Sequence, residues 1–219
     1  MKPILFNTEM VRAILDNRKN VTRRVAKIKI NGGYIVDHAY CETVNYPEKN
    51  IDGICANFYE FDGFYKGAAK PPYQIDDILY VRETFAKSRF ESCLHRSSYE
   101  YGIWYKADGE SERYKYDWKP SIHMPKEAAR VFLRVTDVRV ERLQDMKLED
   151  FMLEGVMPVP PSGEDFELEK GYQYNFSGIW DGTIKHADRE CYGWNANPWV
   201  WVIEFERITK EEAMKYEAD

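Results

Sequence analysis

The chain has 219 residues, of which 44% are hydrophobic and 15% aromatic, and its 31 basic and 37 acidic residues give a net charge of −6. This composition excludes collagen-like and low-complexity chains, and no apolar run approaches the roughly 18 residues that a membrane span needs. No segment has the flanks of a secretory signal peptide, and four scattered cysteines are too few for a disulfide scaffold. We therefore expect a globular, cytoplasmic protein that contacts no membrane.

The acidic balance also bears on nucleic-acid partners. Proteins that bind duplex DNA gain much of their affinity by neutralising phosphates, so the net charge of −6 argues against a duplex. A nucleoside or a short single strand of RNA needs only a local basic pocket. A protein partner is the alternative that the same charge favours.

The N-terminal segment predicts a strand, a helix and a second strand. Residues 1–6 are apolar and predict the first strand. Thr8 is a suitable N-cap for a helix whose apolar residues recur at helical spacing between positions 10 and 15. Asn17 tolerates the left-handed conformation that ends such a helix, and a β-type segment begins in the basic run 18–24.

The middle of the chain alternates irregular segments with short strands. Residues 31–75 predict a long insertion that contains one hairpin near Gly32-Gly33, and a buried strand follows at 78–82. Residues 88–127 predict a second insertion, with an aromatic strand at 99–105.

The C-terminal part predicts two long strands with a helix between them. Residues 130–143 alternate in polarity with a one-residue shift after Asp137, which indicates a bulge or bend. A short helix at 148–154 precedes Gly155. A third insertion covers 156–197, a strand follows at 199–205, and Thr209 caps a final helix.

Short strands dominate this pattern, so we expect a mostly β (α+β) fold. A small β-barrel with helices at its rim accommodates these elements. We expect one domain over residues 1–219, with the three insertions as long loops.

The run 17–24, Asn-Arg-Lys-Asn-Val-Thr-Arg-Arg, resembles the signature of the ASCH family, which is Gly-x-Lys-x-x-Glu-x-Arg after the first helix. Lys19 and Arg24 match its lysine and arginine, and Asn17 replaces a glycine. Thr22 replaces the glutamate, which is similar to the Lys-x-x-Thr form in ASCH proteins that hydrolyse N4-acetylcytidine. The whole set looks most like ASCH proteins of phages and prophages.

The resemblance implies a PUA-like β-barrel and a catalytic trio of Lys19, Thr22 and Glu154, the last at the end of the helix that follows the long strand. It implies a nucleoside or single-stranded RNA ligand, and a hydrolase that removes N4-acyl groups from cytidine-type substrates. We expect no cofactor.

The chemistry of the trio is consistent with this activity. Threonine needs a base to become a nucleophile, and a lysine can serve when burial or neighbouring cations lower its pKa. A glutamate in a partly apolar pocket can be held protonated as an acid. The competing interpretation is structural. The basic run is then a solvated face that complements a helix dipole, Thr22 is an ordinary strand residue, and Glu154 is a surface residue.

Further residues are expected to bind the substrate in the same cleft. Arginine can grip a phosphate or a base edge, and an aromatic ring can stack on a base. The candidates are Arg24, Arg82, Glu83, Tyr192 and Trp194. For Arg82 and Glu83 the alternative is a structural role in a cross-strand ion pair. The aromatic residues of the strand at 199–205 are expected to be core.

The cysteines and histidines do not have the spacing of a zinc site. Cys93-x-His95 and His186-x4-Cys191 lack the close pairs that chelate easily, so we expect no metal.

Two functional alternatives to an enzyme stay open. One is a non-catalytic module that recognises RNA or a modified base, and the other is a phage accessory protein that binds a host protein through its insertions.

Overall fold

The computed structural model describes residues 1–27, 38–46, 51–59, 63, 65–91, 99–110, 116–159 and 167–218. These residues form two compact units. The first contains Met1–Asn17, Ile78–Arg134 and Arg207–Asp219, and the second contains Arg18–Asp77 and Val135–Glu206. The chain therefore crosses between the units several times, and the long strand β9 (Phe132–Arg142) contributes to both.

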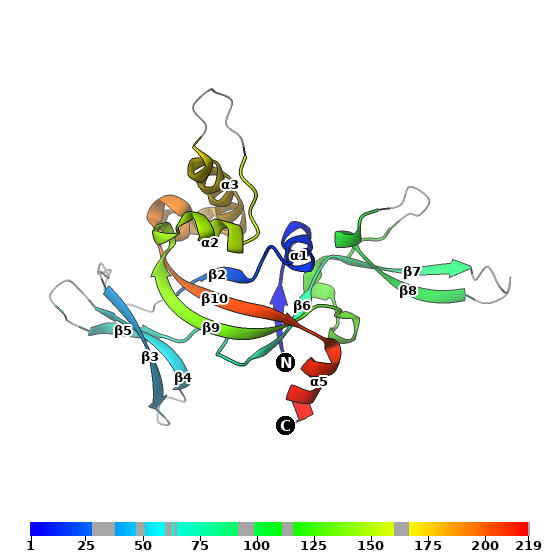
Figure 1. Cartoon of the computed structure of the whole chain (residues 1–219), viewed down its shortest axis with the longest axis horizontal. Helices are drawn as coiled ribbons and strands as arrows, with labels where there is room; N and C mark the ends of the chain where they lie inside the picture. Colours follow the sequence, from blue (N-terminus) through cyan, green and yellow to red (C-terminus); the bar gives the residue numbers. More distant parts are fainter. Residues whose placement is uncertain are drawn as a thin grey trace. The chain divides into compact units, whose positions relative to one another are not determined.

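In the first unit, hydrogen-bonded strands follow the order β1-β6-β9, with β1 parallel to β6 and β6 antiparallel to β9. A separate antiparallel pair, β7 and β8, is visible in Figure 1. The core of the first unit includes the buried residues Ile78, Phe85, Met124 and Phe132. The elements are β1 (Lys2–Leu5), α1 (Thr8–Leu15), β6 (Ile78–Arg82), β7 (Phe85–Glu91), β8 (Tyr99–Tyr105), η2 (Lys106–Asp108), η3 (Ser121–His123), η4 (Lys126–Ala128) and α5 (Lys210–Ala218).

In the second unit, the strand order is β9-β10-β2, and β10 is antiparallel to β2. A three-stranded antiparallel sheet, β3-β4-β5, forms separately, as Figure 1 shows. The elements are β2 (Val21–Val25), β3 (His38–Tyr46), β4 (Ile51–Tyr59), β5 (Tyr65–Ala69), η5 (Leu143–Asp145), α2 (Leu148–Leu153), α3 (Leu168–Thr183), η6 (His186–Asp188), α4 (Arg189–Tyr192), η7 (Trp194–Ala196) and β10 (Trp199–Ile208).

The predicted elements with a strong local pattern are confirmed. β1, α1, β6, β8, α2 and β10 lie where the sequence predicted them. Asn17 is left-handed, with φ of 58°, and Thr209 caps α5 by accepting from Glu212 N at 3.2 Å. The predicted cap of α1 is wrong by one residue, because Asn7 accepts from Met10 N at 2.8 Å and Thr8 is the first helical residue.

The shift in polarity along β9 corresponds to a change in which residues are buried. Leu133 and Val135 are buried before the predicted shift and Val138 after it, while Phe132 is buried as well and Val140 only partly. The strand nevertheless continues without interruption to Arg142. The prediction that β9 and β10 are neighbours is also confirmed. Among the described residues the strands form open sheets, and no closed barrel is present.

Two insertions contain more regular structure than predicted. The first holds the β3-β4-β5 sheet, and the predicted turn at Gly32-Gly33 lies outside the described residues. The third holds α3, a 16-residue helix that the prediction of an irregular loop missed. Its buried residues Tyr172, Phe176 and Trp180 recur every four positions, which is helical spacing. Gly171, Gly178 and Gly182 weaken the helical signal, because glycine has a low helix propensity.

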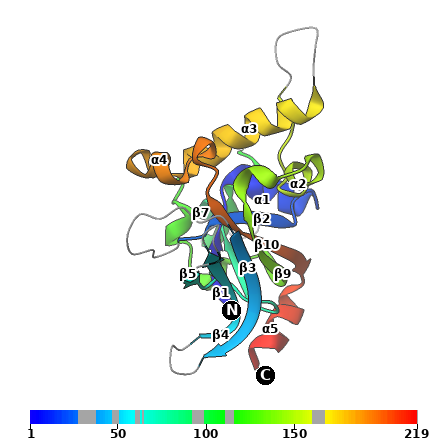
Figure 2. The same cartoon turned by 90° about the vertical axis from the view of Figure 1, so that its left-hand side faces the viewer.

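Helix α3 contributes to the core that supports α2. Phe151 of α2 packs edge-on against Phe176, with ring centroids 5.5 Å apart. The ring centroids of Trp180 and Trp194 lie 6.3 and 5.9 Å from the ring centroid of Phe176. Figure 2 shows α2 next to α3. The position of α2, whose C-cap residue is Glu154, therefore depends on residues of the third insertion. No helix in the described part of the chain combines the length and apolar character that crossing a membrane requires.

Candidate functional site

The basic run 18–20 caps the C-terminus of α2. The last carbonyls of a helix have no partner within the helix, and cations are favourable at this negative end of the helix dipole. Three successive residues of the run satisfy three successive carbonyls, which joins two segments far apart in the sequence. The bonds are Asn20 N to Leu153 O at 3.0 Å, Lys19 Nζ to Glu154 O at 3.0 Å and Arg18 Nη1 to Gly155 O at 3.3 Å.

Lys19 and Glu154 also form a buried ion pair. Lys19 Nζ lies 2.5 Å from Glu154 Oε2, and the two side chains are 0% and 3% exposed. The ammonium donates in addition to Val21 O at 2.7 Å, so each of its three protons has an acceptor. Burial lowers the pKa of Lys19, while the Glu154 carboxylate acts in the opposite direction.

Arg23 is the second cation at Glu154. It projects from β2, its side chain is 0% exposed, and its Nη1 lies 3.4 Å from Glu154 Oε1. Its Nη2 donates to Asp150 Oδ1 at 3.0 Å. The same Asp150 carboxylate accepts from Lys147 N at 2.9 Å at the start of α2. Arg23 therefore binds both ends of this short helix.

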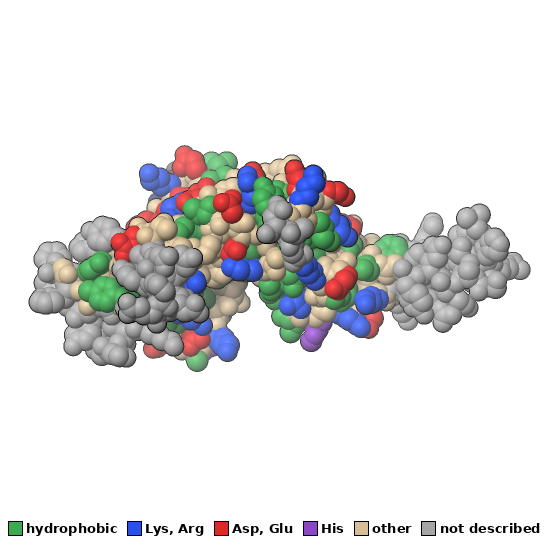
Figure 3. All heavy atoms as spheres, turned by 90° about the horizontal axis from the view of Figure 1, so that it is seen from below, with side chains coloured by type: hydrophobic (Ala, Val, Ile, Leu, Met, Phe, Trp, Pro, Cys, Tyr) green, Lys and Arg blue, Asp and Glu red, His purple; other side chains and the backbone are tan. Residues whose placement is uncertain are grey.

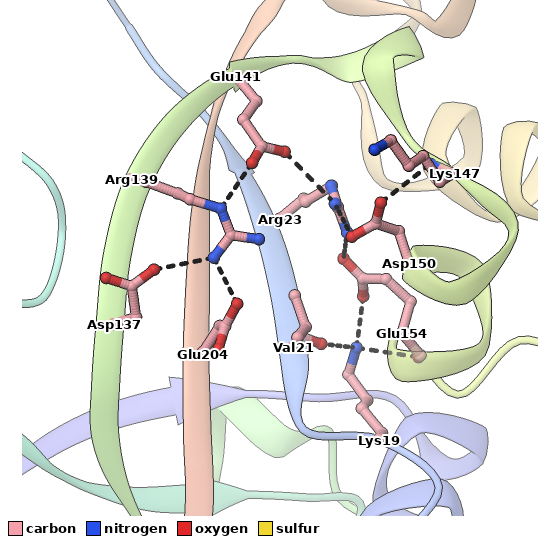
Figure 4. Close-up of polar contacts among 10 residues, drawn as sticks. All are labelled: Lys19, Val21, Arg23, Asp137, Arg139, Glu141, Lys147, Asp150, Glu154 and Glu204. Carbon is pink, nitrogen blue, oxygen red and sulfur yellow. Dashed lines mark hydrogen bonds and ion pairs between the residues drawn. The ribbon is translucent and has the colours of Figure 1, made fainter. Parts of the chain in front are cut away.

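A line of alternating charges continues from Arg23 toward β9 (Figure 4). Glu141 Oε2 lies 3.6 Å from Arg23 Nη2, and Glu141 Oε1 accepts from Arg139 Nε at 2.5 Å. Arg139 also binds Asp137 at 2.8 Å and Glu204. These outer side chains are 28–45% exposed. The network thus extends from a buried pair to partly exposed charges.

Thr22 and Arg24 are the remaining motif residues. Thr22 is 1% exposed and is paired with Ile203 of β10. Side chains alternate along a strand, so Thr22 and Arg24 lie on the face of β2 opposite to Arg23. Burial lowers the pKa of Arg24, while Glu154 and Tyr73 oppose that shift. The structure brings Lys19 into direct contact with Glu154. Thr22 lies on β2, the strand that follows Lys19 in the chain.

Arg82 and Glu83 belong to the first unit, where each has a protein partner. Arg130 binds Glu83 in a bidentate manner, at 2.9 Å to Oε1 and 3.1 Å to Oε2. Glu83 is 1% exposed, and burial raises its pKa. The Arg130 guanidinium also lies 3.9 Å from the Tyr105 ring centroid. Arg82 donates to Ile122 O. Glu83 therefore forms its ion pair with Arg130 and not with its neighbour Arg82, and a role of Arg82 and Glu83 in substrate binding stays a prediction.

Tyr192 and Trp194 lie at the end of the third insertion. Tyr192 O accepts from Trp180 Nε1 at 2.8 Å. Trp194 is half-buried against Phe176, and its backbone N donates to Asp181 at 2.7 Å. Both residues therefore help to fix α3, and their proposed stacking on a base stays a prediction. Trp201 and Phe205 are buried, as expected for core residues, whereas Trp199 is only partly buried.

The described residues place no group of three or more His, Cys, Asp or Glu side chains where they could hold a metal ion. Basic and acidic side chains are interspersed on the face that Figure 3 shows, among the residues drawn in colour.

Comparison of the chain with protein-family models, with curated proteins and with solved structures finds no match. The geometry of the site consequently carries the functional argument. The sequence predicts roles for Lys19 and Glu154 but none for Asp150 or Glu141. The spacing of Asp150 and Glu154, one helical turn apart, was the available signal, because such residues share a helix face.

Proposed function

We propose that this protein binds a nucleoside or an unpaired RNA base and hydrolyses an N4-acyl group from a cytidine-type substrate. Lys19, Thr22 and Glu154 are the proposed catalytic residues. The observation that carries the proposal is the contact between Lys19 Nζ and Glu154 Oε2, two residues 135 positions apart. The resemblance to ASCH proteins required that pairing. The corresponding fold proposal is a PUA-like barrel.

The first step of the proposed reaction is a proton transfer within the ion pair. The Lys19 ammonium carries no lone pair and cannot act as a base. The 2.5 Å contact with Glu154 provides a direct path for one proton from Nζ to Oε2. This transfer produces a neutral amine and a carboxylic acid, which are the base and the acid that amide hydrolysis needs. Burial of Lys19 favours its neutral form.

The second step is acyl transfer to Thr22. Thr22 Oγ1 attacks the acyl carbon and its proton passes to Lys19 Nζ. The bond between the acyl carbon and N4 then breaks, and N4 takes the proton from Glu154. Water attacks the resulting threonine ester and gives one proton to the Glu154 carboxylate, which passes it to Thr22 Oγ1 as the ester bond breaks and a carboxylic acid is released. Both residues of the pair return to their starting protonation states.

Burial of the trio favours a second candidate function. Thr22, Lys19 and Glu154 are 1%, 3% and 5% exposed as whole residues, and all three ammonium protons of Lys19 are in use. A substrate must therefore displace part of the covering structure before Thr22 can react. A module that binds the same nucleoside class without turnover would use the pair only to hold α2 against residues 18–20.

An assay with N4-acetylcytidine separates the two functions. We expect the purified protein to release cytidine and acetate in equal amounts, measured by chromatography. Thr22→Val keeps the volume of the side chain but removes the nucleophile, so it should abolish turnover. Thr22→Ser keeps the hydroxyl and should retain measurable activity. Binding of N4-acetylcytidine with no product over hours would support the non-catalytic module and refute the hydrolase.

A further inference from the structure

The two carboxylate oxygens of Glu154 are held by two different cations. Lys19 Nζ contacts Oε2 at 2.5 Å, and Arg23 Nη1 contacts Oε1 at 3.4 Å. A carboxylate held at both oxygens cannot rotate without losing one of these contacts. Arg23 therefore restricts the orientation in which Glu154 meets Lys19.

Arg23 is itself fixed from two other directions. Asp150 binds Nη2 at 3.0 Å from α2, and Glu141 approaches Nη2 at 3.6 Å from β9. The Nε of Arg23 is buried without a hydrogen-bond partner among the described residues, so the two Nη groups make all of its polar contacts. These contacts unite β2, α2 and β9 around one guanidinium.

We propose that Arg23, held by Asp150 and Glu141, is the positioning residue of the Lys19–Glu154 pair and controls where the proton shared by that pair resides. This inference extends the proposed function to a residue that is absent from the Lys-x-x-Thr motif. Its physical part, the placement of the proton, concerns the folded protein whether or not turnover occurs.

Electrostatics define the direction of the effect. The positive charges of Arg23 and Arg24 both disfavour the ammonium form of Lys19, and the Glu154 carboxylate favours it. Asp150 and Glu141 partly neutralise Arg23 and so weaken its repulsion of Lys19. Removing the charge of Arg23 should stabilise the Lys19 ammonium, and removing the charge of Glu141 should destabilise it. The charged groups around the pair are Arg23 and Arg24 of β2, Glu141 of β9, and Asp150 and Glu154 of α2.

The direct test follows the Lys19 ammonium by NMR in protein with labelled lysine, with the resonance assigned by its loss in Lys19→Met. We expect Arg23→Gln to move the midpoint of the Lys19 titration to higher pH by roughly 1 unit. Glu141→Gln should move it to lower pH. A general loosening of the structure would shift both variants in the same direction, and that outcome would overturn the proposal.

Glu149→Gln is the matched control, because Glu149 is exposed and precedes Asp150 on the same helix. It should leave the midpoint unchanged. Should Arg23→Gln not fold, the Glu141→Gln titration decides, since Glu141 is 28% exposed and removal of its charge is more easily tolerated. An unchanged or raised midpoint in Glu141→Gln would refute the proposal.

Kinetics add a second measurement if N4-acetylcytidine is hydrolysed. The acidic limb of the kcat/KM profile should shift in the same directions as the NMR midpoints. Arg23→Lys keeps the charge but cannot bind both carboxylates with a planar fork. It should keep the acidic limb in place and lower kcat on the order of 10–100-fold with little change in KM. Absence of turnover with the expected NMR shifts would reject only the proposed function.

Discussion

Lys19 and Glu154 are joined both through their backbones and through their side chains. They form an isolated antiparallel bridge, and Lys19 Nζ contacts both the main-chain oxygen and Oε2 of Glu154, at 3.0 and 2.5 Å. One lysine therefore caps a helix and neutralises the carboxylate at its end. Any change at either residue affects the placement of α2 as well as the local charge.

Replacement of Lys19 should strongly destabilise the fold. Lys19→Met removes the 2.5 Å partner of the buried Glu154 carboxylate, and breaking a buried pair in this way costs about 3–5 kcal/mol. The free energy of unfolding from urea denaturation measures the loss. The double variant Lys19→Met/Glu154→Leu removes both charges and should recover much of it, because apolar residues can replace a buried pair.

Lys27→Met is the control for the first variant, since Lys27 is exposed at the end of the described segment 1–27. It should change stability by less than about 0.5 kcal/mol. A Lys19→Met protein as stable as the wild type would show that the pair does not hold α2.

The ion pair should also make the free energy of unfolding vary with pH in the alkaline range. The folded pKa of Lys19 lies below its ordinary value of 10.5. Between these two pKa values the unfolded chain binds the extra proton, so stability rises with pH, by at most about 1.4 kcal/mol per unit. The difference in unfolding free energy between wild type and Lys19→Met/Glu154→Leu should therefore increase toward pH 10.5. Denaturant titrations across this range measure it, and a decrease would mean that the folded pKa is raised.

In the first unit, Glu83 should act on stability through Arg130. Arg130→Met leaves a carboxylate that is 1% exposed without its bidentate partner, which should cost about 3 kcal/mol or more. Asp108→Asn is the matched comparison, because Asp108 binds the same guanidinium but is 53% exposed. It should cost no more than about 1 kcal/mol. Equal losses from the two variants would contradict the assignment of Glu83 as the buried partner.

The core formed by α3 should determine whether α2 is held in place. Trp180→Ala removes a buried ring that stacks on Phe176, and such a change costs about 3–5 kcal/mol. Tyr174→Ala, on the same helix but 75% exposed, should change stability by less than about 0.5 kcal/mol. Thermal and urea unfolding compare them. Similar effects for both would mean that α3 does not belong to the cooperative core.

Several elements could be predicted because their signals are local. The apolar spacing of α1, the compact strand β6 and the glycine after α2 depend on neighbours within a few residues. The helix α3 also has a local signal, in Tyr172, Phe176 and Trp180. Three glycines and the surrounding polar residues give this segment the composition of a loop, and that composition outweighs the helical spacing in a prediction from sequence. The sheet β3-β4-β5 lacks a comparable period, and its strands are stabilised by pairing with one another.

The sequence by itself determined which residue types were available at the site: a basic run after the first helix and a glutamate at the end of a later one. Only the tertiary structure decided that Lys19 and Arg23 are buried and that both meet Glu154. The alternatives of a solvated basic face and a buried charge network have the same local sequence. They differ in the long-range contacts that exclude water, and burial changes the energy of a charge far more than its neighbours along the chain do.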